Sequence, residues 1–116
     1  MNHVLLRITY RLQAHNIEAF EKALKDEILP LIQELGIKAP AVWRTFLGDA
    51  GEYMELWEFE SFTDFEQKWR KLTSNPRLHE IFQTTGPMVL DEKFSLFDPL
   101  ENKSIDDSLN VSRYSV

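Results

Sequence analysis

YMELWEFESFTDFEQKWRKLTSNPRLHEIFQTTGPMVLDEKFSLFDP, residues 53–99, is the stretch that decides the fold of this chain. Its two ends, residues 53–60 and 88–97, are rich in aromatic and aliphatic side chains at alternating positions, which is typical of strands. Both runs also contain a carboxylate, Glu55 in the first and Glu92 in the second. Packing does not require an acid among aromatic residues, so the two glutamates are candidate functional residues.

Two helices are expected between these strands. Thr63 and Glu66 have the spacing of a capping box, and apolar residues follow at helical intervals. Asn75-Pro76 then predicts the start of a second, short helix, with asparagine as the cap and proline at the first helical position. Gly86-Pro87 predicts its end.

The first half of the chain repeats this order of elements. Residues 4–12 alternate as a strand, and Asn16 is a plausible cap for a helix that continues to Gly36. Pro30 lies inside that helical pattern and predicts a kink near residues 26–30. Residues 41–48 predict a further strand, joined to the strand at 53–60 by a tight DAGE turn.

The resulting order, β-α-β-β-α-(α)-β, predicts a ferredoxin-like α+β sandwich with a four-stranded antiparallel sheet and helices on one face. The chain of 116 residues is long enough for one such domain, which we place at residues 1–99. Residues 100–116 are polar and are expected to form a C-terminal tail or an arm that docks on a partner subunit.

Composition excludes several classes of function. The net charge is −6 and the basic residues are scattered, which disfavours a nucleic-acid partner. There is no cysteine, the three histidines lack metal-ligand spacing, and the four glycines form no phosphate-binding loop, so no metal or cofactor is expected. The N-terminal apolar run is too short for a signal peptide or a membrane span, so we expect a cytoplasmic protein without a membrane partner.

The uncovered face of the sheet is expected to be an interface. Several apolar residues have the wrong parity for the helix-covered core, namely Leu5, Met54, Leu56, Val89 and Phe97. An exposed patch of this kind usually marks a contact surface, and a two-fold homodimer with facing sheets is the simplest solution. A monomer with scattered exposed apolar residues is the alternative.

One face of the hairpin combines charge with aromatic rings. If Ala50-Gly51 is the two-residue loop, Phe46 pairs with Glu55, and Arg44 pairs with Trp57 and lies diagonal to Glu55. The functional interpretation is an aromatic pocket with a polar floor for a small ligand. The structural alternative is an ion pair among core aromatics, and a longer loop would separate Arg44 from Glu55.

The chain resembles the NIPSNAP family over roughly residues 5–99. The resemblance rests on EILPLIQELG in the first helix, LGDAGEYMELWEFES across the hairpin, Asn75-Pro76, and GPMVLDEKFSLFDP at the end. It implies a subunit of the dimeric α/β-barrel superfamily, alongside antibiotic-biosynthesis monooxygenases and haem-degrading relatives. The family has no settled chemistry, so the resemblance implies the fold more than an activity.

The first functional hypothesis is therefore a small-molecule binding protein, or a cofactor-independent oxygenase or isomerase acting on a small aromatic or enolisable ligand. Glu55 would act as a base and Arg44 would steady negative charge. The candidate ligand-binding residues are Tyr10, Tyr53, Trp57, Trp69 and Glu92.

Two alternatives remain open. One is a non-catalytic homodimeric interaction module whose aromatic residues only fill the core. The other is a haem-binding or haem-degrading relative, which Trp69 and His79 suggest because those relatives use a tryptophan and a helical histidine. The sequence alone does not show whether Glu55 and Glu92 share a pocket.

Overall fold

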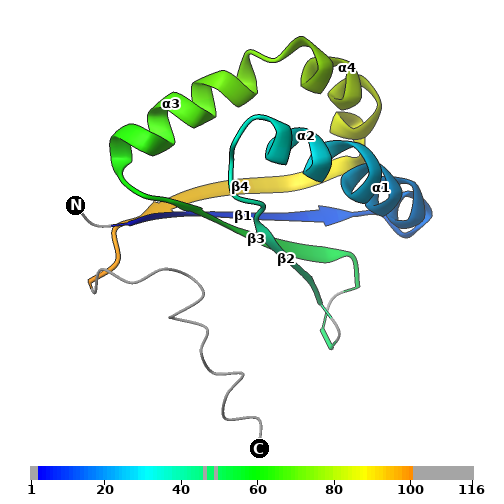
Figure 1. Ribbon diagram of the computed structural model, residues 1–116. Helices are drawn as coiled ribbons and strands as arrows, with labels where there is room; N and C mark the ends of the chain where they lie inside the picture. The colour runs from blue at the N-terminus through cyan, green and yellow to red at the C-terminus, as the bar shows by residue number, and fades with distance from the viewer. Residues whose placement is uncertain (1–2, 46, 49, 101–116) are drawn as a thin grey trace, which may run out of the picture.

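The computed structural model describes residues 3–45, 47–48 and 50–100. Along the chain the elements are β1 (Val4–Leu12), η1 (Ala14–Asn16), α1 (Ile17–Ala23), η2 (Leu24–Ile28), α2 (Leu29–Glu34), β2 (Ala41–Arg44), β3 (Glu52–Phe59), α3 (Phe62–Thr73), α4 (Pro76–Thr85), η3 (Gly86–Met88) and β4 (Val89–Phe97). Figure 1 shows one antiparallel sheet with all of these helices on the same side. The predicted ferredoxin-like α+β sandwich is confirmed.

The sheet has the strand order β2-β3-β1-β4, so β1 and β3 are its two central strands. Alternate residues of these strands point towards the helices and are buried: Val4, Leu6, Ile8, Tyr10 and Leu12 on β1, and Tyr53, Glu55, Trp57 and Phe59 on β3. The strict alternation of buried positions is the pattern expected for a sheet covered on one side. It fixes the register, because a slip by one residue would turn every apolar side chain outward.

The helical layer begins with one long helix interrupted by a π-helical segment. This segment, η2, spans Leu24–Ile28 and ends two residues before Pro30. The predicted kink therefore takes the form of a π-bulge, which is a usual way to accommodate a break in the hydrogen-bond ladder. Asn16 occupies the predicted cap position before α1, but its side chain forms no capping hydrogen bond, since the residue already belongs to the preceding 3-10 turn.

The caps of the last two helices show one correct and one wrong prediction. Asn75 accepts from the backbone N–H groups of Arg77 and Leu78 at the start of α4, as expected. Helix α3, however, starts at Phe62, and its cap is Ser61, which accepts from the N–H of Asp64 at 3.0 Å. The prediction that Thr63 and Glu66 form the capping box of this helix was therefore wrong. Ser61 and Asp64 have the same three-residue spacing.

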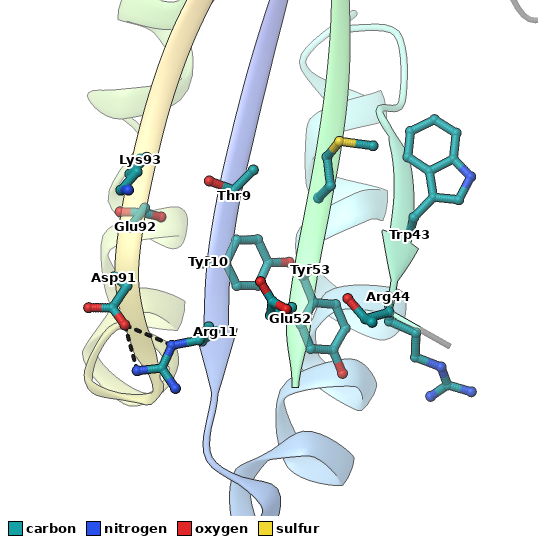
Figure 2. A pocket seen from close by; sticks show the side chains of 12 residues that line it. Thr9, Tyr10, Arg11, Trp43, Arg44, Glu52, Tyr53, Asp91, Glu92 and Lys93 are labelled. Carbon is teal, nitrogen blue, oxygen red and sulfur yellow. Dashed lines mark hydrogen bonds and ion pairs between the residues drawn. The ribbon is translucent and has the colours of Figure 1, made fainter. Parts of the chain in front are cut away.

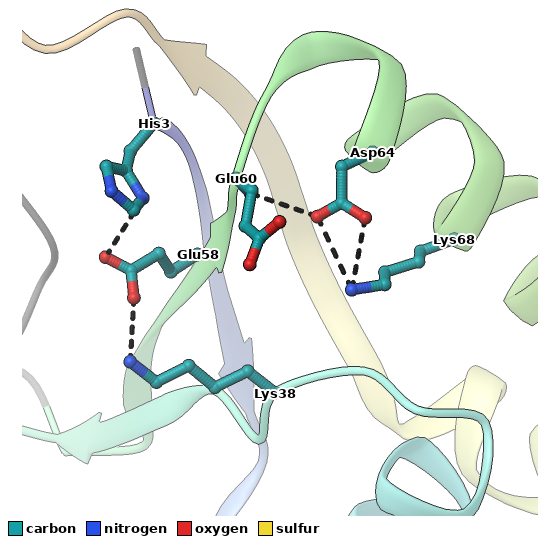
Figure 3. Close-up of polar contacts among 6 residues, drawn as sticks. All are labelled: His3, Lys38, Glu58, Glu60, Asp64 and Lys68. Atoms are coloured by element: carbon teal, nitrogen blue, oxygen red, sulfur yellow. Dashed lines mark hydrogen bonds and ion pairs between the residues drawn. The ribbon is translucent and has the colours of Figure 1, made fainter. Parts of the chain in front are cut away.

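A polar cluster ties the start of α3 and the segment after α2 to the sheet (Figure 3). Lys38 Nζ lies 2.7 Å from an oxygen of Glu58, whose side chain is largely buried. Asp64 accepts from the backbone N–H of Glu60 at 3.0 Å and pairs with Lys68 four residues later. These contacts hold the edge of the helical layer at one end of β3.

A β-bulge changes the faces of β4. Lys93 pairs with Thr9 but Leu90 pairs with Arg11, so Asp91 and Glu92 together lie opposite Tyr10. Asp91 has a φ of 52°, a left-handed conformation that aspartate tolerates better than most residues.

The bulge corrects two sequence predictions. Val89 pairs with Leu12 and packs against the core, although it was expected on the uncovered face. Leu90 does not share a face with Glu92 and Phe94, as the regular alternation predicted for residues 88–97 would require, because the extra residue reverses the alternation between them.

The hairpin also differs from expectation. Strand β2 ends at Arg44 instead of residue 48, and its pairs are Val42 with Glu55 and Arg44 with Tyr53. The connection is thus longer than the predicted two-residue loop, and the register is shifted by four residues. The faces are right, because four is an even number, but the neighbours are wrong. Phe46 and residues 101–116 of the predicted tail lie outside the described residues.

Gly51 is the point at which this hairpin approaches the backbone of β1 closely enough to exclude a side chain. Its φ is 87°, and a Cβ there would lie 2.3 Å from the carbonyl oxygen of Leu12. Gly36 has a similar φ of 77° but open space around the missing Cβ. Gly36→Ala should therefore cost about 1–2 kcal/mol for the left-handed conformation alone.

Gly51→Ala should destabilise the protein clearly more than Gly36→Ala, because the clash is with backbone that cannot move aside. Urea denaturation of the two variants measures the difference. Equal destabilisation would show that the close approach of Gly51 to Leu12 does not constrain the fold.

Candidate functional site

A cavity of about 320 Å³ lies between the helix-covered face of the sheet and the helices. Six rings contribute to its wall: Tyr10, Phe20, Trp57, Trp69, Phe82 and Phe94. Leucine, isoleucine and valine side chains fill most of the remainder. The ionisable acids in the wall are Glu55 and Glu92, and among the described residues that line the cavity there is no lysine, arginine or histidine.

Glu55 is the buried acid of this cavity, with only 7% of its surface exposed. The hydroxyl of Tyr10 donates to Oε2 at 2.7 Å, and the indole N–H of Trp57 donates to Oε1 at 3.0 Å. Tyr10 reaches the carboxylate because it pairs with Tyr53 and is therefore diagonal to Glu55 on the same face. No ion pair to Glu55 exists within the part of the chain that the structure describes.

Burial raises the pKa of Glu55 because the charged form loses its hydration. The hydrogen bonds from Tyr10 and Trp57 act in the opposite direction, and the negative charge of Glu92 raises the pKa further. Tyr10 responds in turn: its burial, then the charge of Glu55, raises the pKa of its hydroxyl far above the usual value. Tyr10 is therefore a permanent donor to Glu55.

Glu92 reaches the same cavity from β4. It follows the bulge at Asp91, and it lines both the interior cavity and a shallow hollow on the uncovered face of the sheet. Partial burial raises the pKa of its carboxyl group as well. Glu55 and Glu92 thus line the same cavity, which the sequence alone could not establish.

Arg44 lies elsewhere, and the predicted pair with Glu55 is not formed. Arg44 Nη1 bonds both oxygens of Glu21 on α1, at 3.0 and 2.9 Å. The hydroxyl of Tyr53 donates to the same carboxylate at 2.6 Å. The physical reason is the register: Arg44 pairs with Tyr53, which places its side chain at the edge of the sheet beside α1.

Tyr53 belongs to this second network and not to the cavity wall. Its ring stacks on that of Tyr10 with centroids 5.4 Å apart. Burial, together with the hydrogen bond and charge of Glu21, raises the pKa of Tyr53 to about 12. The bond from Tyr53 in turn holds the pKa of Glu21 below its usual range, with help from Arg44. Tyr53 therefore packs against the ring of Tyr10 and helps to fix its position.

Trp69 forms part of the cavity wall, whereas His79 does not. The ring of Trp69 meets those of Trp57 and Phe94 edge-on, at 5.8 and 6.0 Å. His79 is exposed on α4, and its ring contacts the backbone carbonyl of Thr73. The two residues suggested for a haem site thus do not face one another across the cavity.

Three residues were missed in the sequence: Glu21, which bonds Arg44 and Tyr53, and Thr73 and Thr85, which line the cavity. Glu21 is an ordinary helical acid whose role depends on the hairpin register, and no local signal marks it. Thr85 lies buried at the end of α4, where its hydroxyl donates to the carbonyl of Ile81. Its helical spacing from the core residue Ile81 could have indicated burial, but not the cavity.

The raised pKa of Glu55 predicts a pH dependence of stability. The pKa of Glu55 in the folded protein lies above its unfolded value of about 4.3. The contribution of Glu55 to the free energy of unfolding is therefore fully present below the unfolded pKa and is lost as the pH rises through the folded pKa. Glu55→Gln keeps the shape but does not ionise; its amide oxygen can accept from the Trp57 N–H, while the Tyr10 hydroxyl turns to accept from the amide N–H. The variant's free energy of unfolding should fall less than that of the wild type as the pH rises above the unfolded pKa of Glu55, which is about 4.3.

Urea denaturation at several pH values checks this, with Glu66→Gln as a control that removes the same charge from the exposed face of α3. The control should follow the wild type. A Glu55→Gln variant with the same pH slope as the wild type would contradict the assignment.

Within the described residues, no helix has the length and apolar character needed to cross a membrane, and no three His, Asp or Glu side chains cluster as metal ligands. The comparison with curated proteins gives no significant match.

Solved structures share the fold at low sequence identity. A NIPSNAP family protein from Agrobacterium tumefaciens superposes with a TM-score of 0.76 at 20% identity, covering 90% of this chain and 94% of that one. A NIPSNAP-like domain protein from Burkholderia xenovorans gives 0.78 at 14% identity, with coverage of 89% and 90%. A protein from Deinococcus radiodurans, provisionally named an antibiotic biosynthesis monooxygenase, gives 0.67 at 14% identity, with coverage of 88% and 97%.

These likenesses establish the fold alone. The sequence itself matches the family model NIPSNAP over residues 5–102, which is most of the chain. The family has no established function, and the match agrees with the resemblance drawn from the hairpin and the final strand. The chain belongs to the NIPSNAP family.

Proposed function

We propose that this protein binds a small, largely apolar molecule in the cavity under the helices, with Glu55 as the polar anchor. The observation that carries the proposal is a buried carboxylate without a cation in the wall of a cavity of about 320 Å³. That volume is at the small end of the range of about 300–1,000 Å³ found for ligand pockets. Burying an acid costs stability, and the core packing does not need one at this position.

The chemistry available to such a ligand is proton transfer. A carboxylate whose pKa is raised by burial is a stronger base than an ordinary one and can accept a proton from an activated C–H or N–H. This supports an isomerase or a cofactor-independent oxygenase as the reaction class. Arg44 no longer supports it, because it bonds Glu21 and does not line the cavity.

Binding is therefore better supported than catalysis. An enolate or a similar anion would need a donor aimed at its developing charge. The donors nearest to Glu55 are Tyr10 and Trp57, and both already bond the carboxylate itself.

A thermal-shift screen of the purified protein against aromatic acids, aromatic amines, quinones, flavins and haem tests the proposal. A ligand at a hundred times its dissociation constant should raise the melting temperature by about 10 °C or more. Glu55→Gln should reduce that shift, and Glu66→Gln should leave it unchanged. Equal shifts in all three proteins would place the binding site outside the cavity.

We further propose that the uncovered face of the sheet forms a homodimer. Leu5, Met54 and Leu56 are only partly covered there, while Trp43 and Phe97 are 39% and 42% exposed. The guanidinium of Arg7 lies 5.2 Å from the centre of the Phe97 ring, which adds a further flat surface. The hollow on this face is bordered by Thr9, Trp43 and Lys93, while Asp91 pairs with Arg11 at its side (Figure 2).

A dimer formed in this way would suit either a ligand-binding protein or a non-catalytic interaction module. Met54→Lys places a charge in the middle of the face and should convert a dimer into a monomer in light scattering. Phe62→Lys, at an exposed apolar residue on α3, is the matched control and should remain dimeric. A wild-type protein that stays monomeric at about 100 μM would overturn the dimer.

A further inference from the structure

Resting on the proposed binding site, we infer that its ligand carries a protonated amine on a small apolar or aromatic body. The inference concerns the sign of the charge that the cavity accepts. Its wall combines two carboxylates with six rings and, among the described residues, no basic side chain. This combination disfavours the acidic and enolisable molecules that a pocket with Arg44 and Glu55 would have selected.

The first argument is the unused acceptor capacity of Glu55. A carboxylate can accept about four hydrogen bonds, and here each oxygen receives one, from Tyr10 and from Trp57. Among the described residues no further donor reaches it. A ligand N–H group would fill an open acceptor site, and a charged N–H group would form the stronger bond.

The second argument is electrostatic. An anionic ligand would enter a low-dielectric space beside Glu55 and Glu92 and would be repelled by both. An ammonium group would instead compensate for the charge that makes the ionised carboxylates costly to bury. The charge of Glu92 already raises the pKa of Glu55, so the two acids act on the same space.

The third argument concerns the rings. Trp57 lies beside Glu55 on β3, and the ring of Trp69 meets the ring of Trp57 edge-on, with centroids 5.8 Å apart. Two indoles therefore border the end of the cavity that holds the acids. Indole faces attract cations, and the effect grows when the pair is removed from water. The remaining rings and aliphatic side chains suit the apolar part of the molecule.

The groups that set the pH dependence are few. Facing Glu55 are Tyr10 from β1, which does not ionise in the usual range, and Glu92 from β4. The described cavity residues from the helices packed against it carry no ionisable group. Binding of a cation should therefore displace a proton from Glu55, and affinity should rise with pH through the folded pKa of this group.

Titration calorimetry with matched probes tests the inference. Phenethylamine, phenethyl alcohol and phenylacetate share one body and differ in the head group, as do tryptamine, tryptophol and indoleacetate. The wild type should bind an amine at least tenfold more tightly than its alcohol and its acid. It should also release a proton on binding, which is measured by repeating the titration in buffers of different ionisation enthalpy.

Glu55→Gln should abolish both the preference for the amine and the proton release, and Glu92→Gln should weaken the preference less, because Glu92 is more exposed. Glu66→Gln should change neither. The pH dependence of the wild type provides the same information if Glu55→Gln does not fold.

Tighter binding of the alcohol or the acid would overturn the inference and leave the binding site standing. If no probe bound at millimolar concentration, the cavity would not be a binding site, and the inference would fail with it. An amine preference that Glu55→Gln retains would also overturn it, because the charge would then act from another site.

Discussion

The hydrogen bond from Tyr10 to Glu55 connects the two central strands underneath the helices, and the interior depends on it. A carboxylate this deeply buried requires donors, and among the described residues these are the diagonal neighbour on β1 and the indole two residues along β3. The bond therefore requires the observed register of β1 and β3. It also prevents the core from closing around Glu55, because an apolar side chain in the place of the cavity would leave the remaining acceptor sites buried and unfilled.

Support for this bond extends outward to the edge of the sheet. Tyr10 stacks on Tyr53, Tyr53 donates to Glu21, and Arg44 bonds Glu21 from an exposed position. Arg44 thus acts on the cavity at a distance, through the placement of two tyrosine rings. Its charge is compensated by Glu21, so no basic side chain among the described cavity residues offsets Glu55 and Glu92.

Much of the fold could be predicted from the sequence, since it depends on local patterns. The alternation in β1 gave both of its ends, and Asn75-Pro76 identified the start of α4, because cap and strand signals act within a few residues. The start of α3 was misplaced for a related reason: Ser61 and Thr63 both precede an acid by three residues, and only the tertiary position of the helix selects between them.

The candidate site was less predictable, because it depends on pairings between distant segments. Face parity placed Glu55 and Trp57 together, but the length of the β2–β3 connection decided which residue neighbours Arg44. The bulge at Asp91 likewise decided that Val89 turns inward. Glu92 and Trp69, both predicted as ligand-binding residues, do line the cavity. Only the three-dimensional packing shows that a space remains between them.

The bulge on β4 has a consequence for how sequences in this family can diverge. Opposite Tyr10 the strand offers two positions, Asp91 and Glu92, where a regular strand would offer one. The first pairs with Arg11 on the outer face, and the second lines the interior. Substitutions at Asp91 should therefore change the outer surface alone, whereas substitutions at Glu92 should change the outer hollow and the lining of the cavity together.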